Sequence, residues 1–324
     1  MNDFSSFCNH TILVTGGAGF IGSHLCEKLL ELGNRVVCLD NFSTGRKENI
    51  SAFQSSLNFT LIEGDIRSLE TCKVAVKGVD YVLHEAALGA VPRSINDPVT
   101  TNEVNISGFL NMLIASRDEK IKRFVYAASS SAYGDSESLP KVENVIGKPL
   151  SPYAVTKYVN ELYADVFSKT YGMETIGLRY FNVFGSRQNP EGPYAAVIPS
   201  FIRQLMNHES PIIYGDGTHS RDFTYVANVV QANLLSLTTT HPEAINQLYN
   251  VACGERTTLN ELAGYLKTLL SQKDPYIKDI EIKHADNRTG DIPHSLADIG
   301  KAKALLGYNP QYSVKEGLES YVKR

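Results

Sequence analysis

A glycine-rich turn between an apolar run and an amphipathic segment constrains the fold of this chain more than any other feature. Residues 11–14 are typical of a buried strand, 15–22 (TGGAGFIG) form the turn, and 19–32 have a helical pattern. Further strand-like runs follow at 35–39, 59–62, 81–84, 124–128 and 175–179, with long helical patterns at 104–117 and 152–170. Buried strands that alternate with helices predict an α/β fold with a Rossmann-type, doubly wound parallel sheet.

The pattern changes after about residue 180. Loops rich in Gly, Pro and Asn surround shorter helical segments there. We therefore expect a dinucleotide-binding domain at 1–180 and a smaller, mixed α/β substrate domain at 181–324. Within the second half, a return segment near 225–255 carries the strand-like run 247–251, which we expect to rejoin the main sheet.

Composition excludes several other classes of protein. The 324 residues are 43% hydrophobic and 20% charged with a net charge of −4, which argues against nucleic acid or an anionic membrane as the main partner. The five cysteines and eight histidines lack metal-ligand spacing, so we expect reduced thiols and no metal. The sequence shows neither a signal-peptide pattern nor an apolar run near the ~20 residues that span a bilayer, which predicts a cytoplasmic protein.

The glycine-rich turn also predicts a cofactor. Gly16, Gly19 and Gly22 allow a tight turn and close approach of the backbone to a pyrophosphate at a helix N-terminus. Asp40 ends the second strand, where a carboxylate binds an adenosine ribose and repels the extra phosphate of NADP. Nearby Arg46 weakens that preference. Glycine-rich turns also occur for structural reasons alone, but the motif and Asp40 together favour NAD.

A second motif carries candidate reacting groups. Ser151 is placed to cap the helix that begins at Pro152, and Tyr153 and Lys157 lie four residues apart on one face of it. A tyrosine acts as a base near pH 7 only if its pKa falls by roughly 3 units, and we expect the nearby lysine, helped by the positive nicotinamide, to lower it. A hydroxyl from the serine run at 129–131 would complete the hydrogen bonding. Without a dinucleotide motif, a surface tyrosine beside a lysine would be the simpler interpretation.

Together, TGGAGFIG, Asp40, the serine run and YAVTK resemble the extended short-chain dehydrogenases/reductases. The stretches 84–98, 150–167, 178–199 and 294–299 more narrowly resemble bacterial UDP-N-acetylglucosamine 4-epimerases, and the resemblance covers nearly the whole chain. It implies tightly held NAD, a UDP-sugar substrate, and catalysis by Tyr153, Lys157 and Ser129. It also implies a homodimer built from the helices around 102–117 and 152–169.

The resemblance also implies binding residues. For the cofactor they are Gly16, Gly19, Phe20, Ile21, Gly22, Asp40, Asn41, Ser43, Thr44, Gly45, Asp65, Ile66, Ala86, Ala87, Asn105, Tyr153, Lys157 and Tyr180. For the UDP-sugar they are Arg93, Ser129, Ser130, Ser131, Asn182, Ala196, Val197, Tyr214, Arg221, Arg288, Asp291 and Ser295. Taken without the resemblance, Asp65 is equally well a turn residue and each arginine a surface ion-pair partner.

The implied reaction interconverts UDP-GlcNAc and UDP-GalNAc through a 4-keto sugar. Related dehydratases and decarboxylases place a carboxylate directly after the catalytic Ser or Thr, whereas this chain has Ser130 and Ser131. A serine hydroxyl is too weak an acid for those reactions, and epimerisation needs no such group. Ser295 leaves space for an acetamido group. Ala90, where relatives carry serine, leaves the preference between acetylated sugars and UDP-Glc/UDP-Gal open.

Three other interpretations stay open. The chain is alternatively a nucleotide-sugar oxidoreductase that exchanges its cofactor, a UDP-uronic acid 4-epimerase, or a catalytically inert NAD-sensing protein. Inert relatives commonly lack the tyrosine or the lysine, and this chain has both.

Overall fold

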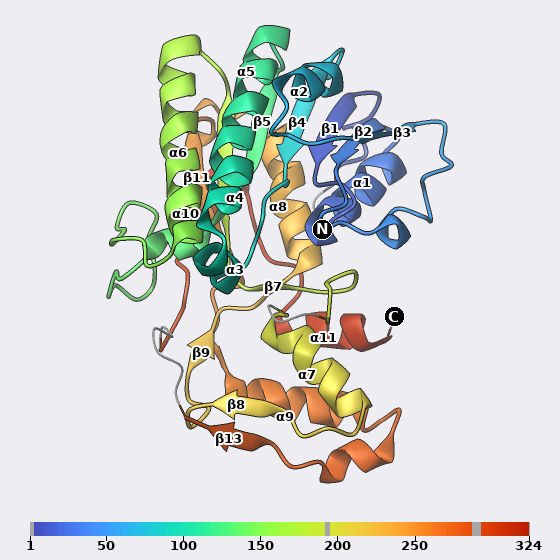
Figure 1. Ribbon diagram of the computed structural model, residues 1–324, viewed down its shortest axis with the longest axis vertical. Helices are drawn as coiled ribbons and strands as arrows, with labels where there is room; N and C mark the ends of the chain where they lie inside the picture. The colour runs from blue at the N-terminus through green and yellow to red at the C-terminus, as the bar shows by residue number, and fades with distance from the viewer. Residues whose placement is uncertain (1–2, 192–194, 287–292, 324) are drawn as a thin grey trace.

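A seven-stranded parallel sheet organises the upper part of the molecule (Figure 1). The computed structural model describes residues 3–191, 195–286 and 293–323. Strand order is β11-β6-β5-β4-β1-β2-β3, and every pairing within it is parallel. The strands are β1 (Thr11–Thr15), β2 (Arg35–Asp40), β3 (Phe59–Glu63), β4 (Tyr81–His84), β5 (Arg123–Ser129), β6 (Thr175–Tyr180) and β11 (Gln247–Val251). The predicted Rossmann-type α/β fold is confirmed, and the run at 247–251 rejoins the sheet beside β6.

Helices cover both faces of the sheet because the central strands are apolar on both sides. Along β1, Ile12 and Val14 face the core beneath α1 (Phe20–Glu31) and α8 (Val226–Thr238), whereas Leu13 faces the opposite core. The opposite core lies beneath α2 (Leu69–Val76), α5 (Phe109–Glu119) and α6 (Pro152–Tyr171). All three side chains are fully buried, as a strand between two helical layers requires.

The structure differs from the prediction of a single regular helix at 104–117. Two short helices, α3 (Val91–Asn96) and α4 (Pro98–Asn102), come first, and a wide π-helical segment, η2 (Glu103–Gly108), leads into α5. Buried Asn105 in η2 accepts a hydrogen bond from the Leu88 N–H and donates one to the Leu88 carbonyl. The segment thereby holds the loop that follows β4, and this tertiary contact is invisible to helical periodicity.

The lower part of the molecule is built from short elements around a core of its own (Figure 1). Phe201 and Leu205 of α7, Ile213 of β8, and Leu262 and Leu266 of α9 belong to this core. Its elements are β7 (Val183–Phe184), α7 (Val197–Met206), β8 (Ile212–Tyr214), β9 (Ser220–Arg221), β10 (Thr224–Tyr225), β12 (Thr257–Thr258), α9 (Leu259–Leu270), β13 (Lys283–Ala285) and α11 (Val314–Lys323). The helix α10 (Gly300–Leu306) instead packs against β11 and α8 of the upper part, where Ala302 and Leu306 join the core of the main sheet. Within the described residues, no helix is both long and apolar enough to cross a bilayer.

Candidate active site

A cavity of about 500 Å³ opens where the parallel strands end. Its walls come from the β1–α1 turn, the ends of β2 and β5, the loops after β3 and β4, and the start of α6. The strand order changes direction between β1 and β4, and crevices at such switch points are where open α/β sheets bind ligands.

The β1–α1 turn is packed too closely for side chains at its key glycines. Gly16 has a φ of +67°, and a Cβ there would lie 2.8 Å from the Ala86 nitrogen. A Cβ at Gly22 would lie 2.2 Å from the Gly16 carbonyl oxygen. No side chain caps the N-terminus of α1 at Gly19, so the helix presents its backbone N–H groups and positive dipole end to the cavity. This arrangement fits a pyrophosphate.

Asp40 is fixed at the end of β2. Its carboxylate accepts hydrogen bonds from the Ala18 N–H at 2.9 Å and the Phe42 N–H at 2.8 Å, and burial raises its pKa. The side chain lines the cavity. A Cβ on Gly45 would lie 2.8 Å from both carboxylate oxygens, so glycine is required there for close packing. A carboxylate fixed in this place can accept hydrogen bonds from the ribose hydroxyls of a dinucleotide.

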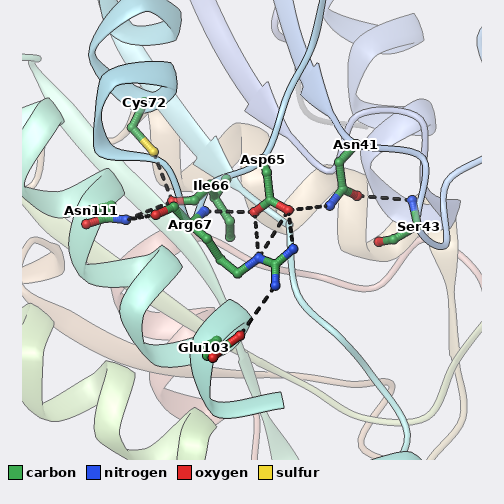
Figure 2. A network of polar contacts seen from close by, with 8 residues as sticks. All are labelled: Asn41, Ser43, Asp65, Ile66, Arg67, Cys72, Glu103 and Asn111. Carbon is green, nitrogen blue, oxygen red and sulfur yellow. Dashed lines mark hydrogen bonds and ion pairs between the residues drawn. The ribbon is translucent and has the colours of Figure 1, made fainter. Parts of the chain in front are cut away.

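The far end of the cavity is lined by a hydrogen-bonded network around Asp65 (Figure 2). The Asp65 carboxylate accepts from Asn41 Nδ2 at 2.9 Å and from the Arg67 guanidinium at 2.8 Å, and Arg67 also pairs with Glu103 at 3.4 Å. The hydrogen bond from Arg67 lowers the pKa of Asp65 to about 2. Asn111 binds the Ile66 and Arg67 carbonyls and ties this loop to α5. Sequence reasoning missed Arg67.

Ser129, Tyr153 and Lys157 meet at the other end of the cavity. The Ser129 Oγ accepts hydrogen bonds from the Ser131 N–H at 3.2 Å and the Ser131 hydroxyl at 2.9 Å. Its own proton is thus available to Tyr153, and the Ser129 hydroxyl lowers the pKa of Tyr153 against the effect of burial. The Lys157 Nζ donates to the Ala127 carbonyl at 2.8 Å and lies 6.0 Å from the centroid of the Tyr153 ring. A hydroxyl, a phenol and an ammonium thus share this end of the cavity, and such groups can transfer a proton.

The expected effect of Lys157 on Tyr153 is not observed within the polypeptide. Burial raises the pKa of Tyr153, and the hydrogen bond with Ser129 is what opposes that rise. Burial also lowers the pKa of Lys157 to about 8, because an ammonium loses hydration inside the protein. The lysine points at a neutral carbonyl rather than at the phenol. Lowering the pKa of Tyr153 below its ordinary value therefore requires charge that binding brings.

A carboxylate that sequence reasoning did not single out shares this end of the cavity. Glu85 follows β4 and accepts a hydrogen bond from the Tyr180 hydroxyl at 2.8 Å. Burial raises its pKa to about 7. In the sequence, Glu85 stands inside the stretch HEAALGA, and only the fold shows that it reaches Tyr180, 95 residues away.

The structure brings most of the expected cofactor residues together. Those that line the cavity are Gly16, Gly19, Phe20, Ile21, Gly22, Asp40, Asn41, Ser43, Thr44, Asp65, Ile66, Ala86, Ala87, Tyr153, Lys157 and Tyr180. Gly45 packs behind Asp40, and Asn105 holds Leu88, so neither is part of the lining.

Among the expected substrate residues, Ser129 and Asn182 line the cavity. Ser130 and Ser131 begin the short helix η3 (Ser130–Tyr133) beside it. The others described lie further away in the fold, with Arg93 in α3, Ala196 and Val197 at the start of α7, Tyr214 in β8, Arg221 in β9, and Ser295 after His294. Arg288 and Asp291 lie outside the described residues.

The buried carboxylate of Asp222 holds loops of the second half of the chain together. Asp222 accepts hydrogen bonds from the backbone N–H groups of Cys253, Gly254 and Ala297 at 3.0–3.2 Å. The Ser295 N–H donates to the Ser220 carbonyl at 3.0 Å, directly before Arg221. Expected substrate residues 74 positions apart in sequence, Arg221 and Ser295, are thus held on neighbouring segments.

Comparisons with known proteins agree with this geometry. Residues 12–252 match the NAD dependent epimerase/dehydratase family. A putative UDP-glucose 4-epimerase of Methanocaldococcus jannaschii is 39% identical over 312 residues, covering 96% of this chain and 97% of that protein.

Two solved structures are also similar. One is a UDP-N-acetylglucosamine 4-epimerase from Methanobrevibacter ruminantium in complex with UDP-N-acetylmuramic acid, at 40% identity, a TM-score of 0.91 and 98% coverage of both chains. The other is a UDP-glucuronic acid 4-epimerase from Bacillus cereus with UDP-glucuronic acid and NAD, at 31% identity, a TM-score of 0.86 and coverage of 97% and 98%. The chain therefore belongs to the NAD dependent epimerase/dehydratase family of short-chain dehydrogenases/reductases, and its cofactor is NAD.

Proposed function

We propose that this protein is a UDP-sugar 4-epimerase that interconverts UDP-GlcNAc and UDP-GalNAc. The observation that carries the proposal is that Ser129, Tyr153 and Lys157 line one cavity together, with no carboxylate at 130 or 131. Similarity to a UDP-N-acetylglucosamine 4-epimerase over 98% of the chain supports the same reaction class.

The residues divide the chemistry between them. Bound NAD supplies reversible two-electron oxidation of the sugar carbon that carries the 4-hydroxyl. Tyr153 takes the proton of that hydroxyl and returns it once the opposite face of the sugar is presented. Ser129 donates a hydrogen bond that favours the phenolate. The Lys157 ammonium, 6.0 Å from the centroid of the Tyr153 ring, adds to the positive charge that the bound cofactor brings. The glycine turn, Asp40 and Asp65 hold the cofactor.

We assign the second domain, 181–324, to UDP binding. Asn182 stands at the boundary between the two halves of the chain and lines the cavity. Tyr214 and Arg221, together with Arg288 and Asp291 of the segment outside the described residues, are the proposed uridine and phosphate contacts. Arginine suits this task because its planar fork donates two hydrogen bonds to a phosphate.

The 2-acetamido preference rests on Ser295. Its backbone is held against Ser220, and its small side chain leaves room for the acetamido group, which Arg93, Ser130 and Ser131 would contact. UDP-glucose and UDP-glucuronic acid are the competing substrates, since similar proteins are epimerases of those sugars. We also place the enzyme in the cytoplasm as a homodimer, with α6 in the interface.

Product analysis tests the assignment. Purified protein is incubated with UDP-GlcNAc, UDP-glucose or UDP-glucuronic acid without added cofactor, and the sugars are separated by chromatography. The proposal expects UDP-GalNAc as the favoured product. A stoichiometric demand for NAD or NADH would indicate an oxidoreductase, no turnover of any sugar would indicate an inert NAD-binding protein, and preferred turnover of UDP-glucuronic acid would indicate the uronic acid epimerase.

Replacement of the proposed base sharpens the test. Tyr153→Phe removes the group that moves the proton, so we expect kcat to fall by about 10²–10⁴ while NAD content and the circular dichroism spectrum are retained. Tyr171→Phe, at the other end of the same helix, is the matched control and should keep full activity. A Tyr153→Phe protein with full activity would refute the proposed role.

A further inference from the structure

Glu85 is the carboxylate of the cavity that the proposed reaction does not yet use. Three acidic residues line the cavity, and two of them, Asp40 and Asp65, are held by backbone N–H groups and by Arg67 at the cofactor's ribose and base end. Glu85 instead lies in the part that Tyr153 and Lys157 also line. Carboxylates in such surroundings are uncommon without a partner, because burial disfavours the charged form.

The hydrogen bonds around Glu85 are fixed in direction. Asn233 of α8 donates from Nδ2 to the Tyr180 hydroxyl oxygen at 2.8 Å. The Tyr180 proton is therefore directed to Glu85, which it reaches at 2.8 Å. The arrangement offers a donor to the carboxylate, and that hydrogen bond lowers the pKa of Glu85 against the effect of burial. Three elements, β4, β6 and α8, thus orient this carboxylate.

Among the described residues that line the cavity, Lys157 is the cation that can balance Glu85. His84 precedes Glu85 but is buried and neutral, because burial lowers its pKa to about 3, and its ring contacts Thr15. Glu161 of α6 already forms a close ion pair with Arg179 of β6. Tyr153 and Tyr180 are neutral near pH 7, since burial raises the pKa of each.

The sheet brings the two charges to the same place. His84 of β4 pairs with Tyr126 of β5, so Glu85 and Ala127 come next on neighbouring segments. The Lys157 Nζ donates to the Ala127 carbonyl at 2.8 Å.

The two charges support each other. The charge of Lys157 lowers the pKa of Glu85, and the charge of Glu85 raises the pKa of Lys157 more than that of Glu161 does. Burial works in the opposite direction on both, so each residue depends on the other to stay ionised near neutral pH. A lysine that lost its proton here would leave Tyr153 without a cation.

We infer that Glu85 is a positioning residue: its carboxylate, oriented by Tyr180, keeps the Lys157 ammonium charged next to Tyr153. This inference rests on the proposed function for its role in turnover. The electrostatic coupling itself concerns only residues of this chain, and it can be measured without any reaction.

The test is the titration of Lys157 in the purified holoenzyme. The ¹⁵Nζ signal of Lys157 is assigned by its loss in Lys157→Met and followed between pH 6 and pH 11. In Glu85→Gln, which keeps an acceptor for Tyr180 but removes the charge, we expect the midpoint to fall by roughly one pH unit. Glu70→Gln, an exposed carboxylate on α2 paired with Lys73, is the charge-matched control and should leave the midpoint unchanged. An equal midpoint in Glu85→Gln and the unmodified protein would overturn the inference.

A second measurement uses only the unmodified protein, so it does not depend on whether a variant folds. In the unmodified protein, the same signal should show an additional, smaller step near pH 7, where Glu85 titrates. A single step would count against the coupling. If the protein epimerises UDP-sugars, the alkaline limb of its kcat–pH profile should move to lower pH in Glu85→Gln by the same amount. If the protein shows no epimerase activity but the titration midpoint of Lys157 still falls in Glu85→Gln, the proposed function is rejected and the coupling between Glu85 and Lys157 stands.

Discussion

Arg67 shows how a single exposed side chain can prepare a binding site. It holds the Asp65 carboxylate at 2.8 Å while pairing with Glu103 on η2, so these contacts orient Asp65 at the rim of the cavity within the chain itself (Figure 2). The side chains are about a quarter to a half exposed, and solvent weakens such pairs. Arg67 therefore matters for holding Asp65 in place rather than for a large contribution to the free energy of unfolding.

The pKa of Asp65 gives this contact a testable pH dependence. Arg67 lowers that pKa from 3.8 to about 2, so the folded state binds the proton more weakly than the unfolded chain. The stabilisation is therefore complete above about pH 5 and is lost as the pH falls from about 4 towards 2. We expect Arg67→Met to lower the free energy of unfolding by about 1 kcal/mol at pH 7, and by less at pH 3.

Urea denaturation at both pH values measures the change. Arg117→Met, which removes a partly exposed arginine that pairs with Asp118 and lies over the Tyr171 ring, is the control and should cost about the same at both pH values. A loss in Arg67→Met that is the same at pH 3 as at pH 7 would contradict the role of Asp65.

At the scale of elements, β6 and α6 are joined by a buried ion pair. The Arg179 Nε and Nη2 donate to the two carboxylate oxygens of Glu161 at 2.8 and 2.7 Å, and both side chains are at most 3% exposed. A third bond, from Arg179 Nη1 to the Glu143 carbonyl at 2.9 Å, fastens the loop before α6. This contact sets where α6, and with it Tyr153 and Lys157, stands against the sheet.

Breaking that pair should be costly, and replacing it should not be. Arg179→Met leaves Glu161 buried without its partner, so we expect a loss of about 3–5 kcal/mol in the free energy of unfolding. Arg179→Met combined with Glu161→Leu removes both charges and should recover most of that loss. Denaturation of the two single variants and the double variant gives the coupling. A double variant as unstable as the sum of the singles would show that the two residues act independently.

Element identity followed well from the sequence, whereas the contacts between elements did not. Apolar runs predicted every strand of the main sheet to within about two residues, because buried strands need side chains that suit both faces. The segment 91–108 was predicted poorly, since its two prolines and its π-helical turn are stabilised by tertiary contacts such as that of Asn105 with Leu88.

The candidate site likewise contains residues that the sequence predicted and residues that it did not. Gly16, Asp40 and Tyr153 belong to local motifs with a known spacing, and the structure places all three at the cavity. Glu85 lies in the resembling stretch 84–98, but neither it nor Arg67 was singled out, because their importance depends on partners supplied by folding. Those partners are Tyr180 from β6 for Glu85 and Glu103 from η2 for Arg67. Sequence spacing also does not reveal that Lys157 points to the Ala127 carbonyl, so the low pKa expected for Tyr153 stays a prediction for the protein with NAD bound.

For the molecule as a whole, α6 has two functions. One side of it lines the reacting end of the cavity, and another side is exposed at the surface. Tyr153 and Lys157 face inward, while Val155, Leu162 and Val166 are 46%, 50% and 52% exposed. The last three lie at i, i+7 and i+11, which places them on one stripe. Exposed apolar stripes of this kind mark interaction surfaces. Figure 1 shows α6 on the outside of the sheet, next to α5.

We predict that this stripe forms the homodimer interface. Leu162→Glu with Val166→Glu puts two charges where the partner's apolar face would be desolvated, so we expect the variant to sediment as a monomer and the unmodified protein as a dimer. Val74→Glu, at an equally exposed apolar position on α2, is the control and should remain dimeric. Because one chain supplies the whole described lining of the cavity, the monomer should still bind NAD. An unmodified protein that sediments as a monomer, or a double variant that remains a dimer, would place the interface elsewhere or remove it.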